Sequence, residues 1–209
     1  ICPVCRTPIP TNQFQDFRSA HPQLRPRDLR RFCREHKHRE ALEEYTSKNY
    51  PTIDWPNFPK RIKRHLPRLQ AVLTDSTLDP SHYRVLHEQR ATKGKERTTL
   101  ALLSSDKILE STTGYYGPRG ARVMMEAITE HLSDLIRECM ISDQVVRFGG
   151  IGNFVQRVLV PELSCCLVME DFGVEAERAR DIVEESGACG GFVNPEVGDR
   201  VTRRLEEED

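Results

Sequence analysis

The sequence has few aromatic residues and no long uninterrupted hydrophobic run. Aromatic residues make up 7% of the 209 residues, too few for the stacking platform on which proteins usually bind single-stranded nucleic acid. The most apolar stretch, residues 154–169, is interrupted by Arg157 and Glu162 and is shorter than the roughly 20 residues that cross a bilayer. We therefore expect a buried helix there and no contact with a membrane.

The sequence also lacks a recognisable catalytic signature. Gly150 and Gly152 begin a Gly-x-Gly pattern, but Val155 stands where a dinucleotide-binding fingerprint requires Gly or Ala, and no βαβ pattern surrounds it. No local arrangement of Ser, His and Asp resembles a hydrolase motif. Three of the cysteines lie in apolar segments, where a thiol usually packs as a small hydrophobic group. These absences predict a protein that is not an enzyme.

The cysteines do not have the pattern of a disulfide-bonded secreted protein. They number seven, which is odd, and we find no hydrophobic leader segment that would direct the chain to an oxidising compartment. We therefore expect reduced thiols in a reducing compartment.

The net charge of −1 conceals an uneven distribution along the chain. The first 100 residues contain 20 Lys and Arg and 11 Asp and Glu, whereas the remaining residues contain 11 and 21. The basic half can meet an anionic partner, or the two halves can attract each other within the fold. Charge alone leaves both interpretations open.

Most of the chain has the periodicity of amphipathic helices. From about Pro118 to Met140, apolar residues recur every three or four positions, as on the buried face of a helix. Prolines interrupt residues 1–32, where we expect loops, and residues 93–103 are predicted as a short strand or an extended loop. Further helices are predicted at about residues 32–47, 62–73, 81–92, 142–148, 153–169 and 174–185.

Caps and prolines refine these helix boundaries. Ser81, Ser142 and Asn153 have side chains that can cap the helices they precede. Pro67 should kink or restart its helix, and we expect an irregularity at Pro161.

Four residues have the spacing of a structural zinc site. Cys2 and Cys5 form a Cys-x2-Cys pair, and Cys33 and His36 form a Cys-x2-His pair later in the chain. Two close pairs suit tetrahedral zinc because each pair can come from one turn of backbone. His38 is an alternative ligand to His36, but it would point to another side of its helix. All four positions would be filled by protein, so we expect a structural ion; the alternative is four reduced side chains in a loop.

These features predict a mainly α fold with few or no strands. We expect a compact helical domain that carries a small N-terminal zinc-knuckle lobe. The lobe and its supporting helix would cover residues 1–48, the helical core residues 49–190 and a C-terminal tail residues 191–209.

Several segments together resemble one protein family. "CPVC", "FCREH", "NYPTIDWPNFP", "GYYGPRGARVM" and "VLVPELSCCLVMED" are similar to segments of the C-terminal domain of the fungal restriction of telomere capping protein 4 family. The resemblance implies a genetic link to telomere capping, a location in the nucleus and cytoplasm, and no known catalytic activity. It also implies that the two Cys and His pairs occupy the family's usual positions.

Basic residues make nucleic acid a candidate partner. Clustered Lys and Arg can neutralise phosphates and gain affinity from counterion release, without reading a base sequence. We therefore predict a non-catalytic nuclear binding module that contacts DNA or chromatin through the basic half. The residues predicted to make this contact are Arg27, Arg30, Arg31, Lys60, Arg61, Lys63 and Arg64.

The alternative function is a protein–protein scaffold or oligomerisation domain without direct contact to nucleic acid. Its candidate interface contains Tyr115, Tyr116 and Arg119, which are residue types enriched at binding hot spots. The same segment also suits a helix-entry turn in which Pro118 opens the helix and the tyrosines pack on the core. The sequence leaves the oligomeric state open.

Overall fold

The structure is a computed structural model of the chain, and it describes residues 1–21, 23–75, 80–92 and 113–196. Every element within these ranges is helical, so the fold is mainly α, as predicted. The helices are α1 Thr11–Ala20, α2 Pro26–Ser47, α3 Phe58–Thr74, α4 His82–Thr92, α7 Gly117–Ser142, α8 Gln144–Arg147, α9 Gly150–Phe154, α10 Val160–Phe172 and α11 Ala176–Val193. A 3-10 turn, Gly114–Tyr116, precedes α7.

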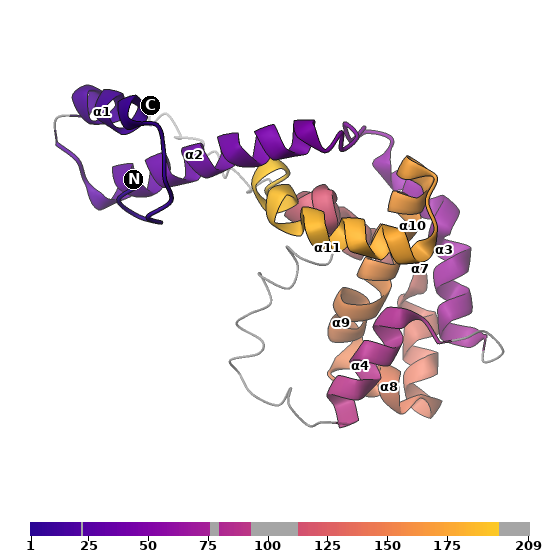
Figure 1. Cartoon of the computed structure of the whole chain (residues 1–209). Helices are drawn as coiled ribbons and strands as arrows, with labels where there is room; N and C mark the ends of the chain where they lie inside the picture. The colour runs from indigo at the N-terminus through magenta and orange to yellow at the C-terminus, as the bar shows by residue number, and fades with distance from the viewer. Residues whose placement is uncertain (22, 76–79, 93–112, 197–209) are drawn as a thin grey trace, which may run out of the picture.

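The helices form two unequal parts that α2 joins (Figure 1). α1 and the N-terminal half of α2 make a small lobe at one end of the molecule, and the remaining helices gather at the other end. α2 packs against α11, which also contacts α7 and α10. α3 packs against α7 and α10. The core therefore surrounds α7, the longest helix.

One apolar core joins these helices. Of the positions predicted to be buried on the central helix, Met124, Ile128, Leu132 and Ile136 are buried in α7, whereas Leu135 and Cys139 are half-buried against the same core. Those predicted for the preceding helix are buried in the same core: Ile62, Leu66, Leu69 and Leu73. Pro67 lies inside α3, which continues through it to Thr74 instead of ending there.

The expectation of loops throughout residues 1–32 is wrong. α1 begins directly after Pro10, and α2 begins at Pro26. Proline suits the start of a helix because the first amide groups have no partner within the helix. The carboxylate of Asp28 supports the start of α2 by accepting a hydrogen bond from Arg25 N at 3.1 Å. These two prolines therefore mark helix starts.

The C-terminal helix is longer than predicted. α11 continues to Val193, whereas the sequence predicts an end near Glu185 and a tail from residue 191. Several glycines follow Glu185 and lower the helix propensity there. In the structure one of them permits close packing, because a Cβ atom added to Gly190 would lie 2.1 Å from Gly114 O. The tertiary contact explains both the glycine and the continued helix.

Capping side chains set two other boundaries. The Ser81 hydroxyl accepts a hydrogen bond from Arg84 N at 3.2 Å, which confirms its predicted role at the start of α4. At α8 the cap is Asp143 and not Ser142. The carboxylate of Asp143 accepts hydrogen bonds from Val145 N at 2.8 Å and from the following amide. The negative charge of a carboxylate there also interacts favourably with the positive, N-terminal end of the helix dipole.

The apolar helix begins before Asn153 and contains an irregular turn. α9 starts at Gly150, and a π-helical turn, Val155–Leu159, connects it to α10. Pro161 has no amide hydrogen, and its ring crowds the carbonyl group one turn earlier. The irregularity predicted at Pro161 is thus found in the preceding turn. Residues 93–103, predicted as strand or loop, lie outside the described residues.

The continuous helix from Gly150 to Phe172 is long and apolar enough to cross a membrane by length and composition alone. Its most apolar window has a mean hydropathy of 1.3, and 67% of that window is buried inside the protein. Such burial is what a core helix requires, and the neighbouring helices α3, α7 and α11 supply it.

Candidate functional site

The four predicted metal ligands converge where the N-terminal loop meets α2. Cys2 and Cys5 belong to the loop before α1, and Cys33 and His36 lie about one turn apart on α2. The four ligand atoms all lie within 4.8 Å of one another, and Cys5 Sγ is 3.2 Å from His36 Nε2. A backbone hydrogen bond from Cys2 N to Thr7 O, 2.9 Å long, closes the loop.

The donor set fits a tetrahedral zinc ion. Zinc takes thiolate sulfur at about 2.3 Å and imidazole nitrogen at about 2.0 Å, so its ligands lie roughly 4 Å or less from one another. Cys2, Cys33 and His36 are buried. Three thiolates and one imidazole would fill all four positions and leave none for water. The arrangement therefore suits a structural ion better than a catalytic one.

Glu40 completes the surroundings of this centre. Glu40 Oε1 lies 3.2 Å from His36 Nδ1. Because Nε2 of His36 faces Cys5, Nδ1 is the nitrogen that can donate to the carboxylate, an arrangement common around metal-binding histidines. The spacing of four residues between His36 and Glu40 was the signal available in the sequence. His38 is exposed on α2 and does not belong to the cluster.

A small aromatic cluster holds α1 against α2 beside the ligands. Phe32 is buried next to Cys33, and its ring centroid lies 5.3 Å from that of Phe14 and 4.9 Å from that of Phe17. The lobe thus has apolar contacts of its own. They are few, so a metal would still supply much of the ordering energy.

The thiols of the cluster differ in acidity. Burial raises the pKa of Cys33 to about 11, and the neighbouring thiols of Cys5 and Cys2 add to the effect. Burial also acts to raise the pKa of Cys5, but hydrogen bonds with the side chain and backbone of Thr7, and then with the thiols of Cys2 and Cys33, outweigh it and lower this pKa to about 6. A metal that binds every thiolate would therefore release a proton from Cys33.

The residues predicted to bind nucleic acid fall into two groups at opposite ends of α2 (Figure 1). One group lies in the N-terminal half of α2 and the other at the start of α3. With 22 residues, α2 is about 33 Å long. The two groups are Arg27, Arg30 and Arg31, and Lys60, Arg61, Lys63 and Arg64.

The group on α2 forms an exposed basic stripe. Arg27, Arg30 and Arg34 recur at intervals of three and four residues, so they share one face of the helix. All three are exposed, and Arg30 and Arg34 form no ion pair within the described ranges. Arg31 lies beside this stripe, and its Nε is 3.4 Å from Glu35 Oε1. We call Arg27, Arg30 and Arg34 the basic stripe.

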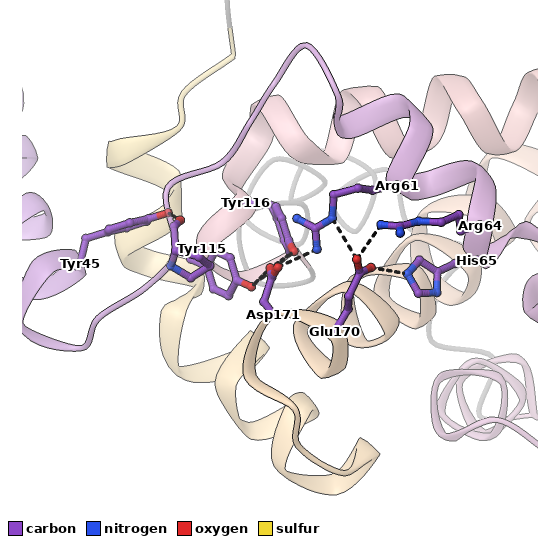
Figure 2. A network of polar contacts seen from close by, with 9 residues as sticks. Tyr45, Arg61, Arg64, His65, Tyr115, Tyr116, Glu170 and Asp171 are labelled. Carbon is purple, nitrogen blue, oxygen red and sulfur yellow. Dashed lines mark hydrogen bonds and ion pairs between the residues drawn. The ribbon is translucent and has the colours of Figure 1, made fainter.

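Two arginines of the group on α3 pair with acidic residues at the end of α10 (Figure 2). Arg61 donates to Asp171 Oδ1 at 2.6 Å, and Arg64 donates to Glu170 Oε1 at 2.6 Å. His65 Nε2 lies 2.9 Å from the other oxygen of Glu170. Burial acts to raise the pKa of Glu170, but the hydrogen bond with His65 and the charges of Arg61 and Arg64 outweigh it and lower the pKa. Arg61 and Arg64 therefore already have partners inside the protein.

The two tyrosines of the predicted interface point into the core. Tyr115 and Tyr116 are fully buried, and both hydroxyl groups donate to Asp171 Oδ2, from Tyr115 at 2.6 Å (Figure 2). Burial, followed by the charge and hydrogen bonding around Asp171, raises the pKa of both tyrosines. Their positions match the helix-entry turn and not a surface patch. Arg119 lies over the ring of Trp55, 4.2 Å from its centroid.

Neither Glu170 nor Asp171 was predicted to be important from the sequence. The available signal was the contrast between a basic first half and an acidic second half, for which attraction within the fold was one interpretation. Around Arg61 that interpretation is what the structure shows. Sequence spacing cannot join residues that are more than a hundred positions apart.

Comparison with known proteins gives matches to one family. A family model described as "RTC4-like domain" matches residues 76–195, which follow the four metal-site residues. The protein named "Restriction of telomere capping protein 4" from Lachancea thermotolerans is 29% identical over 137 residues, 64% of this chain and 35% of that protein. The Kluyveromyces lactis protein of that name is 25% identical over 144 residues, which cover 68% of this chain and 38% of that protein. The chain thus spans about a third of the length of these relatives, and no solved structure matches it.

Proposed function

The chain belongs to the RTC4-like domain family, and we propose that it is a non-catalytic binding module of a nuclear, telomere-related protein. In this proposal the N-terminal lobe contacts the DNA backbone, and the helical core supports that lobe. The telomere connection comes from the name of the two relatives. The observation that carries the contact with DNA is the exposed basic stripe on α2.

The stripe has the properties that phosphate binding requires. Its guanidinium groups lie on one helix face, so they can meet successive phosphates of a duplex backbone. Arg30 and Arg34 have no acidic partner among the described residues that DNA would have to displace. Such contacts give affinity through counterion release and little discrimination between sequences.

The metal centre gives this surface a fixed shape. Cys33 and His36 lie on α2 itself, within three residues of Arg34. A zinc ion bound to them and to Cys2 and Cys5 would fix the N-terminal loop on this part of the helix. We therefore propose a structural role for zinc in presenting the stripe.

The test is DNA binding measured by fluorescence anisotropy on a labelled duplex between about 50 and 200 mM salt. The double variant Arg30→Glu, Arg34→Glu should bind at least tenfold more weakly at the lower salt concentration. Its plot of log affinity against log salt should be less steep by about one for each lost phosphate contact. Lys60→Glu with Lys63→Glu is the matched control, because it changes the net charge equally at the other end of α2.

Equal weakening by both double variants would show a general effect of charge and would remove the stripe from the proposal. If the parent chain binds no duplex at low salt, contact with DNA is excluded. The scaffold alternative would then be preferred, with chromatin proteins or a second copy of the chain as its partner. A mass that rises with protein concentration would identify the second copy.

A further inference from the structure

A pocket lies on the helical core, on the far side of the molecule from the metal centre. It has a volume of about 470 Å³, within the range typical of sites for small molecules. Helices α3, α4, α10 and α11 each contribute to its walls. The polar residues that line it are Arg68, Ser81, His82, Tyr83, Glu162, Cys165 and Arg180.

Glu162 is the unusual member of this group. The side chain is mostly covered, with an exposure of 9%, and it forms no hydrogen bond or ion pair with any residue that the structure describes. Its carboxylate oxygens are not fully enclosed by the protein, so they can pair with a cationic group that enters the pocket. Of the neighbouring polar groups, Tyr83 and Cys165 contact each other, with the Tyr83 hydroxyl 3.5 Å from Cys165 Sγ. Burial and, more weakly, the charge of Glu162 raise the pKa of Cys165 to about 11.

Two guanidinium groups on the pocket walls also lack an ion-pair partner among the residues that the structure describes. Arg68 is exposed and Arg180 half-buried, and neither forms an ion pair within the described ranges. Neither arginine forms an ion pair with Glu162. The pocket therefore presents one negative and two positive groups to the space between them.

This combination selects the chemistry of the occupant. A simple cation would meet two guanidinium groups, and a simple anion would meet the carboxylate of Glu162. A molecule that carries both charges can pair with both sides through charge-assisted hydrogen bonds. One carboxylate and one protonated thiol beside two guanidinium groups do not make a metal site.

We propose that this pocket binds a small zwitterionic molecule of the basic amino acid class. Its ammonium or guanidinium group pairs with Glu162, and its carboxylate pairs with Arg180 or Arg68. The site is separate from the DNA contact proposed above, and its test does not depend on that contact.

The experiment is a titration of the isotopically labelled chain, followed through backbone amide resonances. The first probe is L-arginine. The second is agmatine, which keeps the guanidinium group of arginine but lacks the carboxylate, and the third is acetate. L-arginine should shift amides of α10 and α11 around the pocket, and the other two should bind at least tenfold more weakly, because each loses one charge-assisted pair.

Three variants assign the effect to the pocket. Glu162→Gln and Arg180→Gln should each weaken L-arginine binding at least tenfold. Glu184→Gln removes the same charge as Glu162→Gln from an exposed position of α11 and should bind like the parent. Glu162→Gln should fold normally and melt no lower than the parent without ligand, because it keeps the size of the side chain and removes a charge that has no partner among the described residues.

Four results would each overturn the proposal. The first is that L-arginine shifts no pocket amide at millimolar concentration, and the second is that acetate or agmatine binds as tightly as L-arginine. The third is that Glu162→Gln and Glu184→Gln behave alike. The fourth is that Glu162→Gln melts far below the parent, which would show that this carboxylate stabilises the fold.

Discussion

At the scale of single residues, the proposed zinc site depends on more than its four ligands. His36 can present Nε2 to a metal only if its other nitrogen keeps the proton. The carboxylate of Glu40, 3.2 Å from Nδ1, favours that tautomer and fixes the ring. The ligand spacing alone does not reveal this contact, because Glu40 is one of several acidic residues on α2.

Glu40→Gln should therefore weaken zinc binding by about 10-fold to 100-fold. Competition with a chromophoric chelator measures the affinity. Glu43→Gln is the matched control, because it removes the same charge from an exposed position of the same helix and should keep the parent affinity. Identical affinities for the two variants would show that Glu40 has no role in the site.

At the scale of elements, the contact between α11 and the turn before α7 decides how the core closes. Gly114 and Gly117 have left-handed backbone angles, with φ of 57° and 60°. Gly190 faces them so closely that a Cβ atom there would lie 2.1 Å from Gly114 O. The Asn194 side chain continues the contact by donating to Tyr115 O at 2.8 Å. This close approach places Tyr115 and Tyr116 beside Asp171.

Gly190→Ala should lower the free energy of unfolding by about 1 to 3 kcal/mol, because the added methyl group forces the turn away from α11. Urea unfolding followed by circular dichroism measures the change. Gly152→Ala is the control within a helix, since a Cβ atom there meets nothing within 4 Å. It should raise stability by about 0.5 to 1 kcal/mol. If Gly190→Ala does not lower the free energy of unfolding relative to Gly152→Ala, the close contact at Gly190 is contradicted.

At the scale of the whole molecule, the lobe and the core are stabilised by different means. The core is one continuous apolar cluster across five long helices. The lobe has a small cluster around Phe32 together with the four residues of the proposed zinc site. α2 belongs to both, since Cys33 faces the lobe and Ala41 and Tyr45 are buried in the core.

Removal of zinc should therefore unfold the lobe and leave the core folded. Hydrogen exchange should become fast in residues 1–21 and the first turns of α2 after chelation, while amides of α7 and α10 keep their protection. Cys33→Ser should show the same pattern without a chelator and should contain less zinc when purified. A uniform loss of protection along the chain, or a parent protein without metal, would contradict this division.

The sequence by itself determined the features that depend on local spacing. The Cys-x2-Cys and Cys-x2-His pairs predicted the metal cluster because each pair is made by one turn of backbone. The apolar period of α7 predicted a buried helix because one face of a helix repeats every three to four residues. Prolines and glycines were the weak signals, since Pro26 opens a helix and Gly190 lies inside one.

Only the tertiary structure decided which charges remain available to a partner. Arg30 and Arg61 look alike in the sequence, yet Arg30 is exposed on α2, whereas Arg61 pairs with Asp171 at 2.6 Å. In the folded structure Tyr115 is likewise buried in the core, and Glu162 lines a pocket. These outcomes depend on which helices meet, and contacts between residues far apart in the chain leave no periodic signal. Local chemistry was therefore readable from the sequence, but the accessibility of each charge was not.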